Sequence, residues 1–211
     1  MYNLFMKKES LTKRKIKESA LFLFNEEGTL PTTTNHIAKY AKISTGNLYY
    51  HYKNKEQIIE DLYIKMSEEF DLLNSFEVLL NSENPIKELS FLYDSFGELF
   101  YKYRFMMRDS LVLIALYENI KEIFLQRERL RVSQIESLIE FFIQKEIFIP
   151  LLKEDIKLNA KLNWFISTYW QNFITIDSKI TKETIKEMKE VVFKTNIIPL
   201  LTKKGKILLD I

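Results

Sequence analysis

The chain has 211 residues, of which 46% are hydrophobic and 28% charged, with a formal net charge of +2 and only 4 Gly and 4 Pro. This length allows one large core or two smaller ones, and the composition is typical of a soluble, helix-rich protein. The chain contains no Cys, which excludes disulfides, thiolate zinc sites and thiol redox sensors. Its two His residues, His36 and His51, are too few for a conventional metal sensor. We therefore expect no metal site and no cofactor.

The chain shows no targeting signal, and its charge is unevenly distributed. No apolar run approaches the roughly 18 residues of a membrane span, and the start MYNLFMKKES lacks the basic-then-apolar order of a signal peptide. We therefore expect a cytoplasmic protein with no membrane partner. The first 60 residues hold 10 Lys or Arg and 6 Asp or Glu, a net charge of +4, whereas the remainder carries −2. Such an excess favours phosphate binding, although it is also typical of a solvated surface.

The first predicted helix runs from Leu11 to Glu27 and ends at Gly28. Its buried face is formed by apolar residues at helical spacing, namely Ile16, Ala20, Leu23 and Phe24. Basic residues near its start could contact a phosphate backbone, although such residues usually only improve solubility. They are Lys7, Lys8, Lys13, Arg14 and Lys15.

Two short helices follow. Thr32 and Thr33 are able to cap a helix from about Thr34 to Tyr40, and Ser44 is able to cap a second helix from Thr45 to Tyr52. On the second helix, residues four apart share a face. This spacing places Leu48 and Tyr52 on one face and Asn47, Tyr50 and His51 on another.

A longer helix begins at Lys55. Asn54 is its N-cap candidate, and Gln57 completes a capping-box pattern. A lysine at the first helical position opposes the helix dipole, which is explained if a phosphate binds nearby. The apolar spacing continues as far as Phe70, so we expect this helix to link an N-terminal domain to the rest of the chain.

The remainder is predicted to be helical, with no convincing strand. The Asn84-Pro85 pair starts a helix that continues to about Tyr103. Further helices are predicted at 108–117, as a short buried element, and at 119–145, 154–176 and 181–201. Pro150 ends the helix at 119–145, and Pro199 is expected to kink the helix at 181–201. The β-branched run around Phe148 and Ile149 is the weakest point of the all-α prediction.

The N-terminal pattern resembles a known family. The residues that carry the resemblance are Ile16, Ala20, Leu23, Phe24, Gly28, Thr33, Thr34, Ile37, Ala38, Ala41, Ile43, Ser44, Gly46, Leu48, Tyr49, Tyr52, Lys55 and Glu56. They look like the DNA-binding domain of the TetR/AcrR family of bacterial transcriptional regulators, over roughly the first quarter of the chain. The resemblance implies an all-α protein with a three-helix helix-turn-helix domain at 1–56 and a helical bundle for ligand binding and dimerisation at 57–211.

The resemblance also implies a set of residues that bind double-stranded DNA. They are Thr33, Thr34, Ser44, Thr45, Gly46, Asn47, Tyr49, Tyr50, His51 and Lys55. Asn47 is the best candidate to pair with adenine, and Tyr50 is able to contact a thymine methyl group. Phosphate contacts are expected for Thr33, Thr34, Tyr49 and Lys55. The alternative, that Tyr49, Tyr50 and Tyr52 are all core residues, is expected to hold for Tyr52 alone.

The C-terminal part is rich in aromatic residues and methionine. Nine of these are candidate contacts for a hydrophobic or aromatic small molecule: Met66, Phe70, Phe96, Phe100, Tyr103, Met107, Tyr117, Trp164 and Tyr169. For any one of them, packing in the core is the more frequent explanation. Arg104 and Arg108 could pair with an acidic ligand, although Glu98 or Asp109 could satisfy them equally well.

The family pairs its last two helices across a two-fold axis, so the resemblance implies a homodimer. The candidate interface residues are Trp170, Phe173, Met188, Val192 and Thr195. No catalytic motif such as GxSxG, GxGxxG, a P-loop or HExxH occurs, and we expect no enzyme. The expected function is a ligand-responsive regulator, a repressor that binds a palindromic operator and is released by a small molecule. The alternative is a ligandless DNA-binding protein whose C-terminal domain only dimerises or recruits a partner.

Overall fold

The computed structural model describes residues 10–73 and 76–211 and is all-α. Over these ranges the only β pairing is an isolated bridge between Phe148 and Leu201, so the weak strand signal at this point corresponds to one bridge. The chain divides into two compact units, one ending at Lys65 and the other beginning at Met66. Both units contribute to one helix, α4 (Lys55–Leu73).

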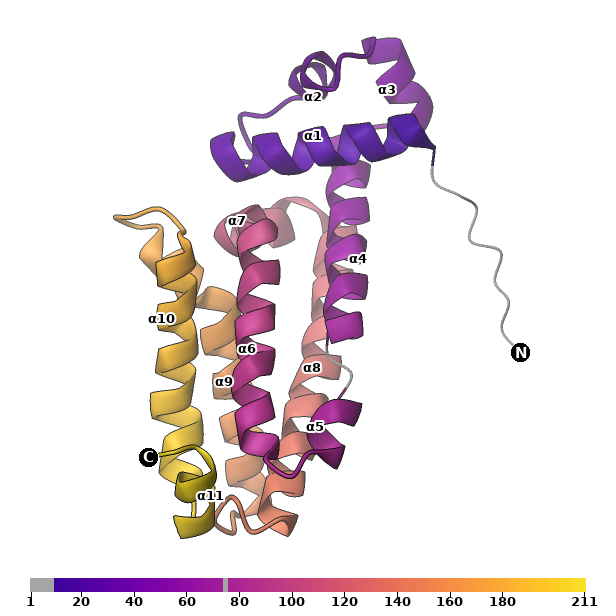
Figure 1. Cartoon of the computed structure of the whole chain (residues 1–211). Coiled ribbons are helices and arrows are strands. Elements are labelled where there is room, and N and C mark those ends of the chain that lie inside the picture. Colours follow the sequence, from indigo (N-terminus) through magenta and orange to yellow (C-terminus); the bar gives the residue numbers. More distant parts are fainter. Residues whose placement is uncertain (1–9, 74–75) are drawn as a thin grey trace, which may run out of the picture. The chain divides into compact units, whose positions relative to one another are not determined.

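The N-terminal unit contains α1 (Leu11–Glu27), α2 (Thr34–Tyr40), α3 (Thr45–His51) and the first part of α4 (Figure 1). The predicted bounds of α1 and α2 are confirmed, and α3 ends one residue earlier than expected. Gly28 has a φ of 97° at the end of α1, a conformation that glycine adopts without steric cost. The core consists of fully buried apolar side chains from all four helices, including Ile16, Phe24, Ile37, Leu48, Ile58, Ile59 and Leu62.

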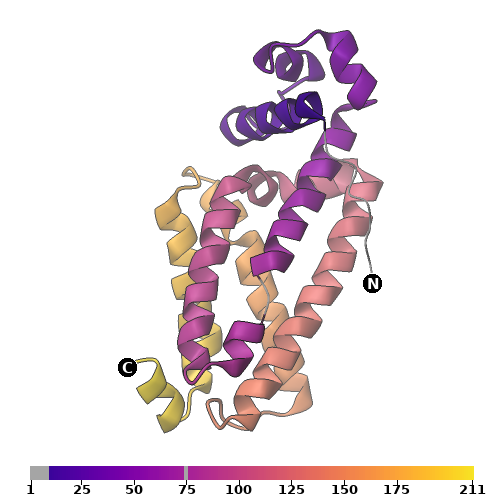
Figure 2. The same cartoon turned by 45° about the vertical axis from the view of Figure 1, so that its right-hand side comes forward.

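The C-terminal unit is a bundle whose long helices run alongside one another (Figures 1 and 2). After the end of α4 it contains α5 (Glu77–Asn81), α6 (Pro85–Lys102), α7 (Arg104–Leu116), α8 (Glu118–Gln144), α9 (Lys153–Ile174), α10 (Lys182–Val192), a π-helical turn (Phe193–Ile197), a 3-10 turn (Ile198–Leu200) and α11 (Lys203–Leu208). Asn84 caps α6 by accepting a hydrogen bond from the Lys87 backbone N–H, as the sequence predicts. The helix predicted at 181–201 is shorter than expected, because α10 ends at Val192 and Pro199 lies in the 3-10 turn.

Three features of this unit differ from the sequence-based prediction. The short helices α5 and α11 were not expected. Helix α7 begins at Arg104 instead of Arg108, and the prediction that it is buried is wrong for one side, because Leu111, Val112 and Leu116 are exposed. A run of apolar residues does not by itself show how many sides of a helix are covered.

The centre of the C-terminal unit combines apolar packing with buried polar contacts from α9. Met188, Val192 and Phe142 are buried in the main hydrophobic cluster. The buried Tyr93 hydroxyl of α6 donates to Asn163 Oδ1 on α9 at 2.8 Å, and burial raises the pKa of Tyr93 to about 12. Because an unpaired buried hydroxyl is costly, this bond fixes the register of α9 against α6.

The last helix is held by a close backbone approach. The Thr202 N–H donates to the Ile147 carbonyl at 2.9 Å, and a Cβ at Gly205 would lie 2.4 Å from that carbonyl oxygen. Only glycine therefore fits at this position of α11. None of the described helices is both long and apolar enough to span a membrane.

Candidate nucleic-acid interface

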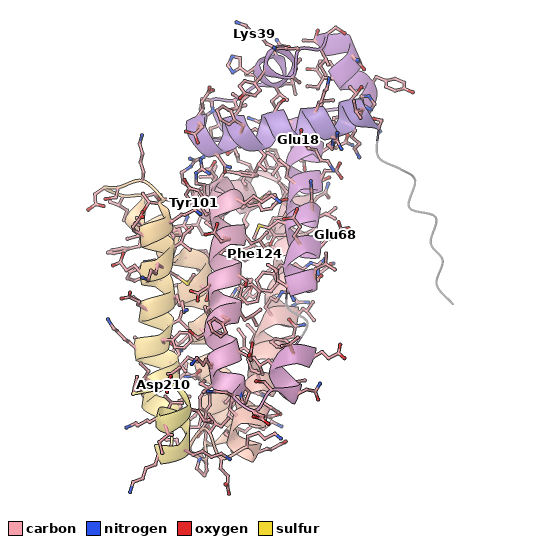
Figure 3. The ribbon with its side chains drawn as sticks, viewed as in Figure 1. Glu18, Lys39, Glu68, Tyr101, Phe124 and Asp210 are labelled. Atoms are coloured by element: carbon pink, nitrogen blue, oxygen red, sulfur yellow. The ribbon has the colours of Figure 1, made fainter. Side chains whose placement is uncertain are left out.

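Helices α2 and α3 form a helix-turn-helix whose caps are supplied by hydroxyl side chains. Thr33 Oγ1 accepts from the His36 N–H at 3.2 Å at the start of α2. Ser44 Oγ accepts from the Asn47 N–H at 3.1 Å at the start of α3. In the turn between the helices, Lys42 has a φ of 56°, which is the left-handed backbone conformation that glycine adopts most readily. Because this residue is a lysine, the sequence does not indicate that conformation. Lys39 projects from α2 away from α1 (Figure 3).

The outer surface of α3 is polar and aromatic. The Tyr50 side chain is 84% exposed and Tyr49 is 52% exposed, whereas Leu48 and Tyr52 are buried. Thr45, Gly46 and Asn47 are exposed as well. The prediction that Tyr52 alone is a core tyrosine is therefore confirmed. This arrangement leaves one side of α3 available to enter a groove of DNA.

A hydroxyl pair joins the two helices at this surface. Thr34 Oγ1 of α2 and the Tyr49 hydroxyl of α3 lie 3.0 Å apart, and both side chains retain exposed area. Two hydroxyls at this separation can donate to one phosphate oxygen, which would fix the register of the duplex without reading a base. Their role in binding a phosphate remains a prediction.

Lys55 has a structural role that the sequence did not indicate. Its Nζ donates to the Thr29 carbonyl at 2.6 Å and to the Thr32 carbonyl at 3.0 Å. Burial lowers the pKa of the Lys55 ammonium. These hydrogen bonds join the start of α4 to the loop after α1. They account for a positive charge at the first position of α4 without a bound anion. The phosphate contact expected for Lys55 remains a prediction.

The start of α4 has a modified capping box. The Gln57 N–H donates to Asn54 Oδ1 at 2.9 Å, as predicted. The Gln57 side chain accepts from the Lys53 N–H at 2.9 Å instead of from the Asn54 N–H. The cap therefore extends one residue beyond the usual pattern.

Asp61 connects α4 to the buried tyrosine of the helix-turn-helix. Its Oδ2 accepts from the Tyr52 hydroxyl at 2.6 Å and forms an ion pair with Lys13 Nζ at 2.8 Å. Burial raises the pKa of Asp61, but the hydrogen bonds from Lys13 and Tyr52 and the positive charges of Lys13 and Lys17 together hold the pKa below its ordinary value of 3.8. Lys13 therefore has a partner inside the N-terminal unit, whereas Lys7 and Lys8 lie outside the described residues.

The candidate ligand residues of the C-terminal unit fall mainly into two aromatic groups. Phe70 stacks on Phe96 with ring centroids 4.2 Å apart and lies 6.2 Å from Phe100. In the second group, Phe124 of α8 lies 6.1 Å from Trp164 and 6.5 Å from Tyr169. Met107 and Tyr103 are buried, and Met66 and Tyr117 are half-buried. The sequence did not single out Phe124 for this role.

The end of α4 is held by three consecutive residues, which we call the α4 clamp: Glu69, Phe70 and Asp71. Glu69 accepts hydrogen bonds from Lys102 Nζ at 2.7 Å and from the Tyr103 hydroxyl at 3.0 Å. Burial and the Glu69 charge raise the pKa of the Tyr103 hydroxyl.

The other two residues of the clamp face α8. The Arg131 guanidinium lies over the Phe70 ring, 4.3 Å from its centroid. Asp71 forms ion pairs with Arg131 and, at 3.2 Å, with Arg127. Adjacent residues of one helix therefore contact α6, 33 residues further along the chain, and α8, 56 to 60 residues further along. Local sequence patterns do not reveal contacts over such separations.

The structure resolves one alternative left open by the sequence. Arg108 pairs with Asp109 through two hydrogen bonds, of 2.7 and 3.1 Å, while Arg104 lies over the Tyr101 ring. Asp109 is thus the partner of Arg108.

A surface depression of about 210 Å³ lies between α6 and α10. Lys182, Lys186 and Lys189 supply much of its lining, so it differs from the aromatic ligand site that the sequence predicts.

Two family models match the chain. Residues 16–62 match a model described as bacterial regulatory proteins, tetR family, and residues 69–207 match one described as bacterial transcriptional repressor. The chain belongs to the TetR family. The predicted fold class, an N-terminal helix-turn-helix domain with a C-terminal helical domain, is confirmed.

Individual relatives agree with this assignment. The TetR-family chain is 34% identical to IcaR, the negative transcriptional regulator of the biofilm operon icaADBC of Staphylococcus aureus (strain Newman), over 89 residues, which are 42% of this chain and 46% of IcaR. It spans less than half the length of the curated relatives it matches. A TetR-family regulator from Marinobacter aquaeolei VT8 has a TM-score of 0.80 at 25% identity, over 95% of this chain and 97% of that chain.

A more distant neighbour is AibR, whose structure is described as a complex with isovaleryl coenzyme A and operator DNA. Its TM-score is 0.60 at 20% identity, over 88% of this TetR-family chain and 98% of AibR. At that identity the likeness shows the fold alone.

The expected dimer residues of this TetR-family chain need a correction. Met188 and Val192 are 1% and 0% exposed, so they belong to the core of the single chain and have no surface to offer a partner. Trp170 is half-buried and packs against the same core. Phe173 and Thr195 are exposed. Of the five residues, only these last two have substantial free surface.

A second apolar face was missed. Exposed residues at helical spacing form a stripe on α9, which we call the α9 stripe: Leu158, Leu162, Phe165 and Phe173. The separations of four, three and eight residues keep these side chains on one side of the helix. The spacing is visible in the sequence, but only the burial distinguishes this free face from the covered one.

Proposed function

We propose that the chain is a transcriptional repressor that binds a palindromic operator as a homodimer and is released by a small hydrophobic or aromatic molecule. The observation that carries the DNA-binding part is the surface of α3, where Asn47, Tyr49 and Tyr50 are exposed beside a buried Leu48. An α-helix with such a surface fits the major groove.

Within this interface we assign separate roles to the predicted residues. Asn47 pairs with adenine through its side-chain amide. Thr34 and Tyr49 bind one phosphate through their hydroxyl groups, whose oxygen atoms lie 3.0 Å apart. Ser44 and Thr33 already cap their helices, so their contribution to DNA binding is to hold α3 and α2 in place.

Dimerisation is supported by the α9 stripe. A contiguous apolar face on a soluble helix favours association with another surface. A second copy of the chain is the simplest occupant, because a two-fold axis places the same face on both subunits. A dimer also fits DNA binding, since one short helix reads few base pairs and two copies read a palindrome. Phe173 is the member of the stripe that was already predicted from the sequence.

Ligand release is proposed to act through the α4 clamp. The two aromatic groups, around Phe70 and around Phe124, provide surfaces for a flat apolar molecule. The AibR neighbour is described with an acyl coenzyme A and operator DNA, which supports the idea that this fold accommodates both partners. A ligand that separates Phe70 from Phe96 would favour a different position of the end of α4, and its effect is limited to its difference in affinity for the two states.

One observation favours the ligandless alternative. Phe70 and Phe96 stack closely on each other, and Tyr103 is fully buried, so these candidate ligand residues already have packing partners. Operator affinity measured with and without saturating hydrophobic compounds distinguishes the two proposals. An affinity that no compound changes supports the alternative.

The decisive experiment for the DNA-binding proposal is selection of bound sequences from a random DNA pool with the full chain. We expect enrichment of a palindrome. Asn47→Ala is expected to weaken binding to the selected site by about 1–3 kcal/mol, the usual value of a bidentate base contact. The matched control is Asn81→Ala, because Asn81 is an exposed asparagine at the end of α5. A pool without enriched sequences would refute the proposal.

A further inference from the structure

The seven residues of α3 are TGNLYYH and include neither Lys nor Arg. This matters because guanine presents two acceptors in the major groove, which Arg and Lys side chains bind best. The nearest lysine beyond the helix on its C-terminal side is Lys53, and the Lys55 ammonium is engaged with the Thr29 and Thr32 carbonyls. The outer side of α3 itself therefore presents no Lys or Arg side chain, and the nearest lysine on its N-terminal side is Lys42, before the Ser44 cap.

The exposed amide and aromatic side chains of α3 match the major-groove edges of A·T pairs. The exposed Asn47 side chain can donate to adenine N7 and accept from adenine N6. Thymine presents an acceptor and a methyl group, and the methyl group requires an apolar surface. Tyr50 is 84% exposed, against 52% for Tyr49, so its ring offers an apolar surface on the outer side of α3.

The neighbouring aromatic side chains have other contacts. The Tyr49 hydroxyl is paired with Thr34. The His51 ring is half-buried and meets the Tyr50 ring edge-on, with centroids 5.1 Å apart and planes at 83°. This contact restricts the Tyr50 ring, so that it presents a defined face at low entropic cost.

We infer that α3 recognises A·T pairs and that Tyr50 is the specificity-determining residue, through the 5-methyl group of a thymine. This inference rests on the proposed function, because it concerns the same interface. It goes further by naming the base pairs that the operator contains and the chemical group, the thymine methyl, that the protein recognises. Lysines outside α3 then contribute to phosphate binding and not to base choice.

The test uses the full chain and the palindrome selected from a random pool. Each thymine of one half-site is replaced in turn by deoxyuridine, which removes the methyl group and keeps the hydrogen-bonding edge. At one position per half-site we expect an affinity loss of about fourfold, the value of one buried methyl group, and about 15-fold when both half-sites are changed.

Two variants connect this loss to Tyr50. Tyr50→Ala is expected to bind the thymine and deoxyuridine duplexes equally, whereas Tyr50→Phe keeps the ring and therefore the difference. Tyr49→Phe serves as the matched control, because it is expected to weaken binding to both duplexes by the same factor. Since Tyr50 is exposed, its substitutions leave the core of the N-terminal unit unchanged.

The outcomes separate this inference from the proposed function. If the pool yields no enriched sequence, the proposed function fails. If a palindrome is enriched but its affinity is insensitive to every deoxyuridine substitution, or if Tyr50→Ala retains the sensitivity, then only the inference on Tyr50 is overturned. Enrichment of guanine at the positions whose base preference changes in Asn47→Ala would overturn the assignment to A·T pairs.

Discussion

The α4 clamp makes a quantitative prediction about stability. Asp71→Asn keeps the size of the side chain but removes the charge opposite Arg131, whose side chain is only 7% exposed. Removing one partner of a fully buried ion pair costs about 3–5 kcal/mol, because the other charge stays buried without compensation. The Asp71 side chain is 44% exposed, so water screens the pair, and Gln134 still accepts from Arg131 at 2.8 Å. We expect a loss of about 1–2 kcal/mol.

The matched control applies the same chemical change to an exposed pair of the same unit. Asp210 pairs with Lys87 at 3.4 Å, and both side chains are at least half exposed. Asp210→Asn is therefore expected to cost less than about 0.5 kcal/mol. Both free energies of unfolding are measured by urea denaturation followed by circular dichroism, at two protein concentrations because dimerisation shifts apparent stability. Equal values for the two variants would show that the clamp contributes nothing beyond an ordinary surface pair.

Two further predictions concern the dimer and the acid sensitivity of the N-terminal unit. Phe165→Glu on the α9 stripe is expected to convert a dimer to a monomer in sedimentation at micromolar concentration, whereas Phe91→Glu, at an exposed phenylalanine of α6, leaves the dimer intact; a dimer in both variants contradicts the proposed interface. Asp61 has a lowered pKa, so its stabilising contribution is present above about pH 4 and is lost as the pH falls through the lowered pKa. The stability difference between the wild type and Asp61→Asn should therefore be present at pH 7 and decline at pH 3, as followed by urea denaturation at the two pH values.

Local patterns predicted the helix-turn-helix closely because its boundaries are set by local chemistry. Gly28 ends α1 in a conformation that favours glycine, and Thr33 and Ser44 cap α2 and α3 through hydrogen bonds to residues three positions ahead. Each of these interactions lies within one turn of the helix end. Both partners of each of these contacts therefore lie within a few residues of each other, where a local pattern can indicate them.

Lys55 shows where this approach reaches its limit. The sequence indicated only that its charge opposes the dipole of α4, and a phosphate was the local explanation. Its partners, the carbonyls of Thr29 and Thr32, lie 26 and 23 residues away. A backbone carbonyl carries no residue-specific signal, so no pattern of residue types would have identified this contact.

The two apolar stripes of the last long helices show a related limit. The buried face of α10, with Ile185, Met188 and Val192, and the exposed stripe of α9, which includes Leu162 and Phe165, have similar spacing. Periodicity identifies an apolar face but does not show whether the same chain or a second copy covers it. The tertiary structure distinguishes the two faces, because α6 and α9 pack against α10 and cover its apolar face. The uncovered stripe is therefore the better candidate for a symmetric interface, and a dimer formed through it would keep the buried face of α10 as the fixed core of each subunit.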